Sequence, residues 1–298
     1  MGNIKDDSIE RIRELTGSDK VDFIDINDTF GFKCQQCGKC CMHRTDIILS
    51  PFDIYNGAKY LGIKPEEFLI KYCRTDLGAN SKIPMVLLRS SSNGFCPLLK
   101  YDIKDGGKFK CMIHAAKPGA CSNHPIGVMY SIDKSTGCSE TRYIKVEQCQ
   151  NSVSDEQQLV KDWIKPYLDN KAEIDTSRRV QHLPADYFDT REFWMTLSTI
   201  HEISKFTKHD TLSFNASEAL NLYMTQTIGI GYANYDINKP FIEQAEENIN
   251  LLSKFYENSK ELLESLKEPI KEMKETVLKG LIRENNTEGE TTTNDDNS

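Results

Sequence analysis

The sequence predicts an α+β fold, in which a small cysteine-rich metal-binding domain of short helices and β-hairpins is followed by an α-helical domain. Three observations indicate this division. All ten cysteines of the 298-residue chain lie between residues 34 and 149. The same part of the chain has short apolar stretches bounded by Gly, Pro, Ser and Asn, which is typical of strands and turns. The part that follows has apolar residues three and four apart, which is typical of helices.

Changes in composition divide the chain into four expected segments. Residues 1–30 are polar and should form a loosely attached N-terminal arm. Residues 31–152 should form the cysteine-cluster metal-binding domain, and residues 153–283 the helical domain. Residues 284–298 are polar and of low complexity, so we expect a disordered tail.

The densest cysteine motif comes at the start of the second segment. Cys34, Cys37, Cys40 and Cys41 are separated only by polar residues and one glycine. Two thiolates three residues apart can converge on one metal ion, and Gly38 allows the chain to turn back with a positive φ. The side chains of adjacent residues diverge. We therefore expect Cys40 and Cys41 to serve two different metals, or one metal and one other role.

Four further cysteines lie at the ends of expected short strands, where a metal contributes most to folding. The predicted metal ligands are Cys34, Cys37, Cys40, Cys41, Cys96, Cys111, Cys121 and Cys149. Cys138 follows the turn-forming residues of an expected hairpin tip, whereas Cys149 comes after the returning strand, so hairpin geometry selects Cys149. Cys73 stands alone at a helix end and should be a core residue.

Other polar motifs give no catalytic constellation. Gly229-x-Gly231 has no third glycine and no strand–loop–helix context, so it is not a dinucleotide or S-adenosylmethionine loop. His201 should be a core histidine on an apolar helix. Three histidines lie near the cysteines: His43, His114 and His124. They could bind or hydrogen-bond a cluster, but we expect them at the surface or beside the metal ligands.

Net charge and hydropathy exclude several classes of partner. A formal charge of −8 argues against nucleic acid and anionic membranes, because no basic face is available to release counterions. Residues 1–30 lack the apolar region of a signal peptide, and no apolar run reaches spanning length. We therefore expect a cytoplasmic protein without a nucleic-acid or membrane partner. In that reducing compartment, dense cysteines favour a metal site over disulfides.

Local signals predict the elements of the cysteine-rich half. Ser50 as N-cap and Pro51 as first helical residue start a helix that Gly62 ends, and Pro65 starts a second helix that runs to residue 72. An extended segment and two hairpins should follow, at residues 83–89, at 95–101 with 108–113, and at 127–133 with 142–146.

Helical periodicity dominates the rest of the chain. Ser154 and Gln157 read as a capping box before a helix that Pro166 breaks, and Gly229 with Gly231 as a turn. Helices are expected at residues 191–205, 217–227 and 240–268, with a further piece after Pro269 to about residue 283. The last of these helices has a heptad seam, which we expect to pack against the protein's own helices and not in a partner coiled coil.

Four segments of the first half, in order, resemble the YkgJ-type cysteine-cluster family, also described as the CxxCxxCC zinc- or iron-chelating domain. They are the Cys34–Cys41 run, Leu49-Ser50-Pro51-Phe52-Asp53-Ile54, Cys96-Pro97-Leu98, and Cys111 with Lys117-Pro118 and Cys121. A related branch includes the flagellin lysine N-methylases, for which an iron-sulfur cluster is implied. Where that family usually has Arg-Pro before the seventh cysteine and Arg after it, this chain has Lys117-Pro118 and Cys121-Ser122-Asn123-His124.

Two functional hypotheses follow. In the first, the protein is a cytosolic iron-sulfur protein, with a 4Fe-4S cluster favoured by the resemblance, and extends to a protein-modifying enzyme such as a methyl transferase. In the second, the metal is structural zinc and the helical domain binds a protein partner. Four thiolates suit either tetrahedral zinc or a cubane cluster, so the residues alone leave both open.

Overall fold

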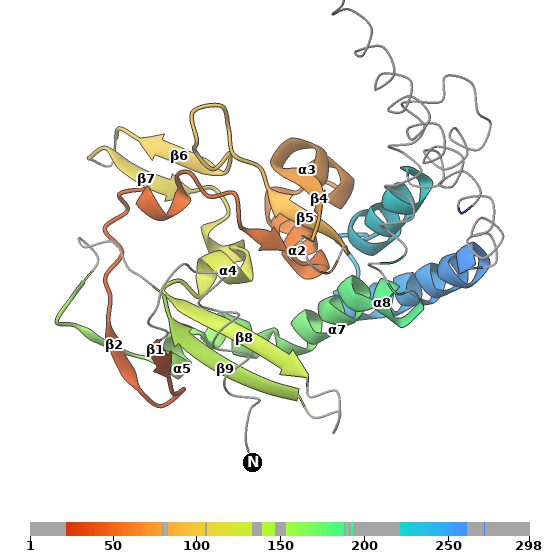
Figure 1. The fold of residues 1–298 in the computed structure, drawn as a ribbon. Helices are drawn as coiled ribbons and strands as arrows, with labels where there is room; N and C mark the ends of the chain where they lie inside the picture. Colours follow the sequence, from red (N-terminus) through yellow and green to blue (C-terminus); the bar gives the residue numbers. More distant parts are fainter. Residues whose placement is uncertain are drawn as a thin grey trace, which may run out of the picture.

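The computed structural model describes residues 22–78, 81, 83–104, 106–132, 139–146, 153–187, 189, 192, 221–260 and 271. Small antiparallel sheets and short helices occupy residues 22–187, and helices occupy residues 221–260 (Figure 1). The predicted α+β class is therefore confirmed.

Four small sheets, all antiparallel, organise the first part of the chain. The first sheet has the strand order β1 (Asp22–Ile24), β9 (Ser139–Lys145) and β8 (Ile126–Ile132), and the second pairs β10 (Gln157–Leu159) with β2 (Thr29–Gly31). The third has the order β3 (Ile48–Leu49), β5 (Pro84–Leu88) and β4 (Cys73–Leu77). The fourth pairs β6 (Leu99–Asp102) with β7 (Lys108–Cys111). The pairs β6–β7 and β8–β9 are the two predicted hairpins, and β5 is the predicted extended segment.

The first long helix, α2 (Pro51–Leu61), begins and ends where the sequence predicts. The Ser50 side chain accepts a hydrogen bond from the Asp53 N–H, and the Asp53 carboxylate accepts one from the Ser50 N–H, which completes a capping box. Gly62 ends the helix with φ +67°, in the left-handed region that glycine adopts without strain. The next helix, α3 (Pro65–Tyr72), is also as predicted.

The remaining described helices are short, apart from α7 (Lys171–His182) and the one at residues 241–260. The short ones are η1 (Lys39–Cys41), η2 (His114–Ala116), α4 (Gly119–Ser122), α5 (Val160–Trp163), α6 (Lys165–Asp169), α8 (Pro184–Tyr187), residues 221–228 and the π-helical turn η4 (Gly229–Ala233). None of the described helices is long and apolar enough to cross a membrane.

Two sequence predictions in this region are wrong. Ser154 and Gln157 form no capping box, because Gln157 starts β10 and pairs with Gly31, and the helix begins only at Val160. The residues from Gly229 continue the preceding helix as a π-helical turn and do not form a loop turn. The predicted break at Pro166 is confirmed, since this proline lies in the first turn of a new helix, α6.

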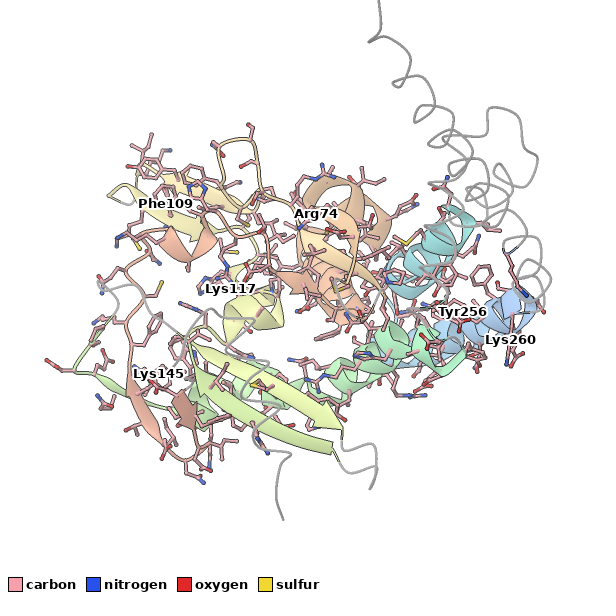
Figure 2. All side chains as sticks on the ribbon, in the orientation of Figure 1. Arg74, Phe109, Lys117, Lys145, Tyr256 and Lys260 are labelled. Carbon is pink, nitrogen blue, oxygen red and sulfur yellow. The ribbon has the colours of Figure 1, made fainter. Side chains whose placement is uncertain are left out.

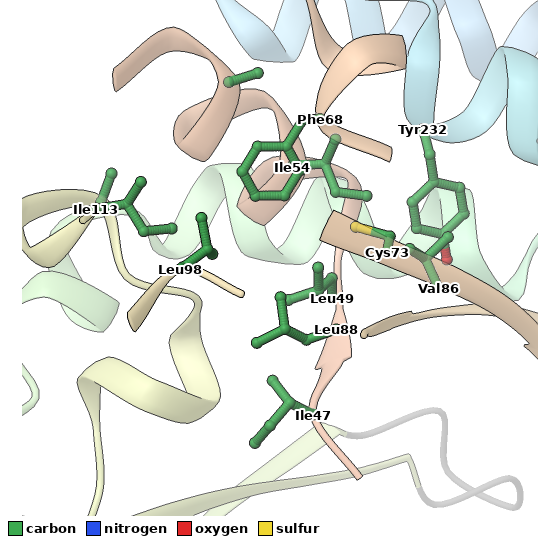
Figure 3. Close-up of a cluster of buried hydrophobic side chains, with 12 residues drawn as sticks. Ile47, Leu49, Ile54, Phe68, Cys73, Val86, Leu88, Leu98, Ile113 and Tyr232 are labelled. Carbon is green, nitrogen blue, oxygen red and sulfur yellow. The ribbon is translucent and has the colours of Figure 1, made fainter. Parts of the chain in front are cut away.

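Two buried clusters join the segments expected to be separate domains. The cluster around α2, α3 and β5 includes Tyr232 of η4, from the helical half (Figure 3). Conversely, Tyr55 of α2 lies in the cluster formed by α7 and the helices of residues 221–260. The strands β1 and β2 likewise bring residues of the expected arm into sheets with β9 and β10.

The heptad seam is buried within the chain. Ala245, Ile249, Leu252 and Tyr256 of the helix at residues 241–260 belong to the same core cluster as Tyr55. This agrees with the expected packing against the protein's own helices. The predicted helix at 191–205 with His201, the pieces beyond residue 260, the tail at 284–298 and residues 1–21 of the arm lie outside the described part, apart from the single positions 192 and 271.

Candidate metal centre

Seven of the eight predicted ligands line one cavity of about 250 Å³. They are Cys34, Cys37, Cys40, Cys41, Cys96, Cys111 and Cys121. Cys149, the eighth, and Cys138 lie outside the described residues. Cys73 does not line the cavity and is 3% exposed in the core cluster, as predicted for an isolated cysteine.

A close backbone approach shapes the loop of the first four cysteines. Gly38 has φ +75°, as predicted, and a Cβ atom added there would lie 2.9 Å from Cγ of Phe109 on β7. The Phe109 N–H donates a hydrogen bond to the carbonyl of Gln36 at 3.0 Å. Glycine is therefore needed here both for the dihedral angle and for the contact that places the cysteine loop on the β6–β7 hairpin.

Backbone hydrogen bonds bring two distant cysteines to the same loop. The Cys96 N–H donates to the Cys41 carbonyl at 2.9 Å, and the Leu99 N–H donates to the Cys96 carbonyl at 3.0 Å. In the hairpin, Cys111 pairs with Leu99 across the strands. The strand register thus places Cys96 and Cys111 on the cavity that the motif loop covers.

The last described ligand candidate lies on α4, next to α2. The Cys121 N–H donates to the carbonyl of Pro118 at 2.8 Å, which closes the turn. Lys117, at the start of this turn, also lines the cavity and is labelled in Figure 2.

The adjacent thiols Cys40 and Cys41 do not diverge, in contrast to the expectation from the sequence. Their sulfurs lie 3.9 Å apart on the 3₁₀ turn η1. Two sulfurs on one tetrahedral zinc, with Zn–S bonds of about 2.3 Å, are about 3.8 Å apart. The tight turn rotates neighbouring Cβ atoms less far apart than a strand would, so the pair can share one metal.

Hydrogen bonding and burial give the thiols of the cavity different pKa values. The pKa of Cys40 falls to about 6 because Cys41 donates a hydrogen bond to its sulfur and because Lys117 and Arg44 lie nearby, although burial opposes the shift. The same hydrogen bond, together with burial, raises the pKa of Cys41. Burial raises the pKa of Cys121 to about 12. Metal binding at the buried thiols would therefore have to displace protons.

Three cations accompany the thiols, and the described residues that line the cavity include no carboxylate. Arg44 binds Asp46 through Nε and Nη2 at 2.6 and 2.8 Å, and Lys110 contacts Asp102 at 3.1 Å. The third cation is Lys117. Positive charge beside several thiolates offsets the negative charge of a thiolate-bound metal.

Of the three neighbouring histidines, two line the cavity: His114 and His124. His43 does not line it, and its ring lies against Gly94. The pKa of His124 is lowered, first by burial and then by the positive charge of Arg44 and Lys117. A neutral imidazole in this position can bind a metal or hydrogen-bond a ligand.

The donor set fits a soft metal, since seven thiols and two imidazoles suit zinc or iron-sulfur chemistry. Within the described part of the chain, no three His, Cys, Asp or Glu side chains already form a group able to hold an ion. The thiols surround the cavity without converging on one point. The cysteine side chains can change rotamer when a metal binds. The type of donor and the cavity therefore suit such a metal, although the thiols do not form a closed coordination shell.

This arrangement defines a cysteine-lined cavity whose thiols and imidazoles are donors that suit zinc or iron. Residues 33–152 match the family model CxxCxxCC, described as "Putative zinc- or iron-chelating domain". No curated protein matches the chain, and no solved structure matches it.

Several residues of the centre were not predicted from the sequence. Arg44 and Phe109 line the cavity although neither belongs to a recognisable motif. Asp53 was visible only as part of a helix start, yet its Oδ1 accepts a hydrogen bond from the Gly119 N–H on α4 at 2.9 Å. Contacts between segments this far apart leave no local signal in a single sequence.

Proposed function

We propose that the protein holds an iron-sulfur cluster, of the 4Fe-4S type, in the cysteine-lined cavity. The proposed ligands come from Cys34, Cys37, Cys40, Cys41, Cys96, Cys111, Cys121 and Cys149. The observation that carries the proposal is the gathering of seven of these thiols around one cavity of about 250 Å³.

The size of the cavity supports a cluster over a single ion. In a zinc site, four cysteine sulfurs lie about 2.3 Å from the ion. Such a site needs little more space than one water molecule, which takes up about 30 Å³ in the liquid. The cavity of about 250 Å³ is several times larger. A body of several metal and sulfide atoms uses this space better than one ion does.

The charge around the cavity also supports the proposal. Four thiolates make a cluster site anionic, and Lys117 and Arg44 supply positive charge beside Cys40 and Cys121. Phe32, Leu98 and Phe109 line the apolar part of the wall. Bound there, a cluster of this kind exchanges single electrons.

The second candidate function is a structural zinc module with a helical protein-interaction domain. The 3.9 Å between the Cys40 and Cys41 sulfurs favours it, since this distance suits one tetrahedral zinc. Leu222 and Leu251, which are 53% and 47% exposed, would then belong to the surface that contacts the protein partner. Colourless protein that carries stoichiometric zinc would support this candidate.

The volume of the cavity makes protein methyl transfer a less favoured function than cluster binding alone. Small-molecule pockets usually have about 300–1,000 Å³, and a cluster would fill much of the 250 Å³ here. Little space would remain for a co-substrate such as S-adenosylmethionine. Calorimetry on intact metal-loaded protein tests this function directly, and saturable binding of S-adenosylmethionine would support methyl transfer.

The first experiment is purification without oxygen, followed by absorption spectroscopy. The proposed function predicts brown protein with thiolate-to-iron charge-transfer bands, which bleach on reduction. A protein without visible absorption would remove the iron-sulfur proposal.

A further inference from the structure

The turn that carries Cys121 is held at both of its ends. At its start, the Gly119 N–H donates a hydrogen bond to Oδ1 of Asp53 at 2.9 Å. At its end, Nε1 of Trp163 donates to the carbonyl of Asn123 at 3.1 Å. Lys117 and Cys121, which flank Gly119, both line the cavity. The position of two cavity-lining side chains therefore depends on these two hydrogen bonds.

The two carboxylate oxygens of Asp53 have separate roles. Oδ2 accepts hydrogen bonds from the Ser50 N–H and from the Ser50 hydroxyl, both at 2.8 Å, and so completes the helix cap of α2. Oδ1 accepts the hydrogen bond from the Gly119 N–H on α4. Capping boxes usually have Glu or Gln at this third helical position. The cap alone does not require the shorter aspartate, whereas the bond to α4 does.

We propose that Asp53 is a positioning residue of the metal centre, which fixes the Lys117–Cys121 turn through the Gly119 N–H so that Cys121 faces the cavity. This inference rests on the proposed function only in that the cavity holds a metal, whichever metal it is. Residues that hold a ligand in place without touching the metal commonly change metal affinity by about 10–100-fold when replaced.

Two crossed variants separate this role from helix capping. Asp53→Glu keeps a carboxylate for the capping box but lengthens the side chain by one methylene, which breaks the bond to Gly119. Ser50→Ala removes the cap hydroxyl and leaves the bond between Asp53 and Gly119 intact. The full-length protein is loaded with Co²⁺, whose thiolate charge-transfer band reports the bound metal. The release rate into excess EDTA and the melting temperature are then measured.

Asp53→Glu should release Co²⁺ about 10–100-fold faster than wild type, while the melting temperature of the metal-free protein stays similar to that of wild type. Ser50→Ala should melt at a lower temperature and release Co²⁺ within about twofold of wild type. Asp53→Asn is a second variant in case Asp53→Glu does not fold. Its amide oxygen accepts more weakly than a carboxylate, so release should again be faster.

Release at the wild-type rate from the folded Asp53 variants would overturn the positioning role. Equal acceleration by Ser50→Ala would also overturn it, because helix stability would then explain the effect. If the purified protein holds zinc and no iron, the iron-sulfur proposal fails, and the release rates still decide the role of Asp53. Wild-type protein that binds neither Co²⁺, zinc nor iron would overturn both proposals.

Discussion

The hydroxyl of Tyr55 on α2 donates a hydrogen bond to the backbone carbonyl of Lys239 at 2.7 Å, across 184 positions of the chain. The N–H of the neighbouring Phe52 donates to Oγ of Ser177, a buried residue of α7. The helix α2 of the cysteine-rich half is therefore bonded to two segments of the helical half.

We expect the two halves to unfold together. Because Tyr55 and Tyr232 each lie in a core cluster formed mainly by the other half, removing the metal should destabilise both. Far- and near-ultraviolet circular dichroism during thermal unfolding of the chelator-treated protein should show a single, coincident transition. Two separate transitions, with most helix signal retained in the first, would support the division near residue 152 that the sequence predicts.

Gly38 should be essential for the cysteine loop. Gly38→Ala adds a Cβ atom at φ +75° and 2.9 Å from Cγ of Phe109, so it combines backbone strain of about 1–2 kcal/mol with a steric clash. Gly106→Ala is a matched control, because Gly106 has φ +68° and nothing within 4 Å of the added atom. We expect Gly38→Ala to lose metal and to lower the free energy of unfolding by more than the control does. Equal effects of the two variants would show that the contact with Phe109 is unimportant.

Cys149 and Cys138 should differ in their effect on metal content. Both lie outside the described residues, and the hairpin formed by β8 and β9 has the position that the sequence argument assumed. Cys149→Ser should lower bound metal and destabilise the protein by several kcal/mol, as loss of a ligand from a folding-coupled site would. Cys138→Ser should leave the metal content unchanged. Metal analysis that gives the reverse pattern would move the eighth ligand to the hairpin tip.

Thiol alkylation in metal-free protein should depend strongly on pH and position. Only thiolates react, so the rate at Cys40, with a pKa of about 6, should be nearly maximal at pH 7 and fall as the pH drops below 6. Burial raises the pKa of Cys73 to about 12, so this residue should remain unmodified at neutral pH. Mass spectrometry after a short exposure to iodoacetamide measures both. Faster labelling of Cys73 than of Cys40 would contradict the described burial.

Elements specified by neighbouring residues were predictable from the sequence. Ser50, Pro51 and Gly62 define α2 because a capping hydroxyl, a fixed φ and a left-handed residue each act within one turn. The same holds for the β6–β7 hairpin. The cysteine spacing, likewise, indicated which thiols gather at one cavity.

Contacts between segments far apart in the chain determine the structural features that the sequence did not predict. Gln157 fits a capping box locally, but its pairing with Gly31 of β2 makes it a strand residue. A Cβ atom at Gly31 would collide with the carbonyl of Ser154, so glycine at that site permits the pairing. Arg44 lines the cavity, and Asp53 accepts a hydrogen bond from Gly119 on α4. No pattern within their own segments predicts either position.

The central claim, that the cavity holds a 4Fe-4S cluster, is tested most directly by the stoichiometry of iron, acid-labile sulfide and zinc in protein purified without oxygen. The account predicts about four iron and about four sulfide per chain, with little zinc, and a loss of both when Cys96 or Cys121 is replaced by serine. About one zinc per chain, without sulfide, would contradict it.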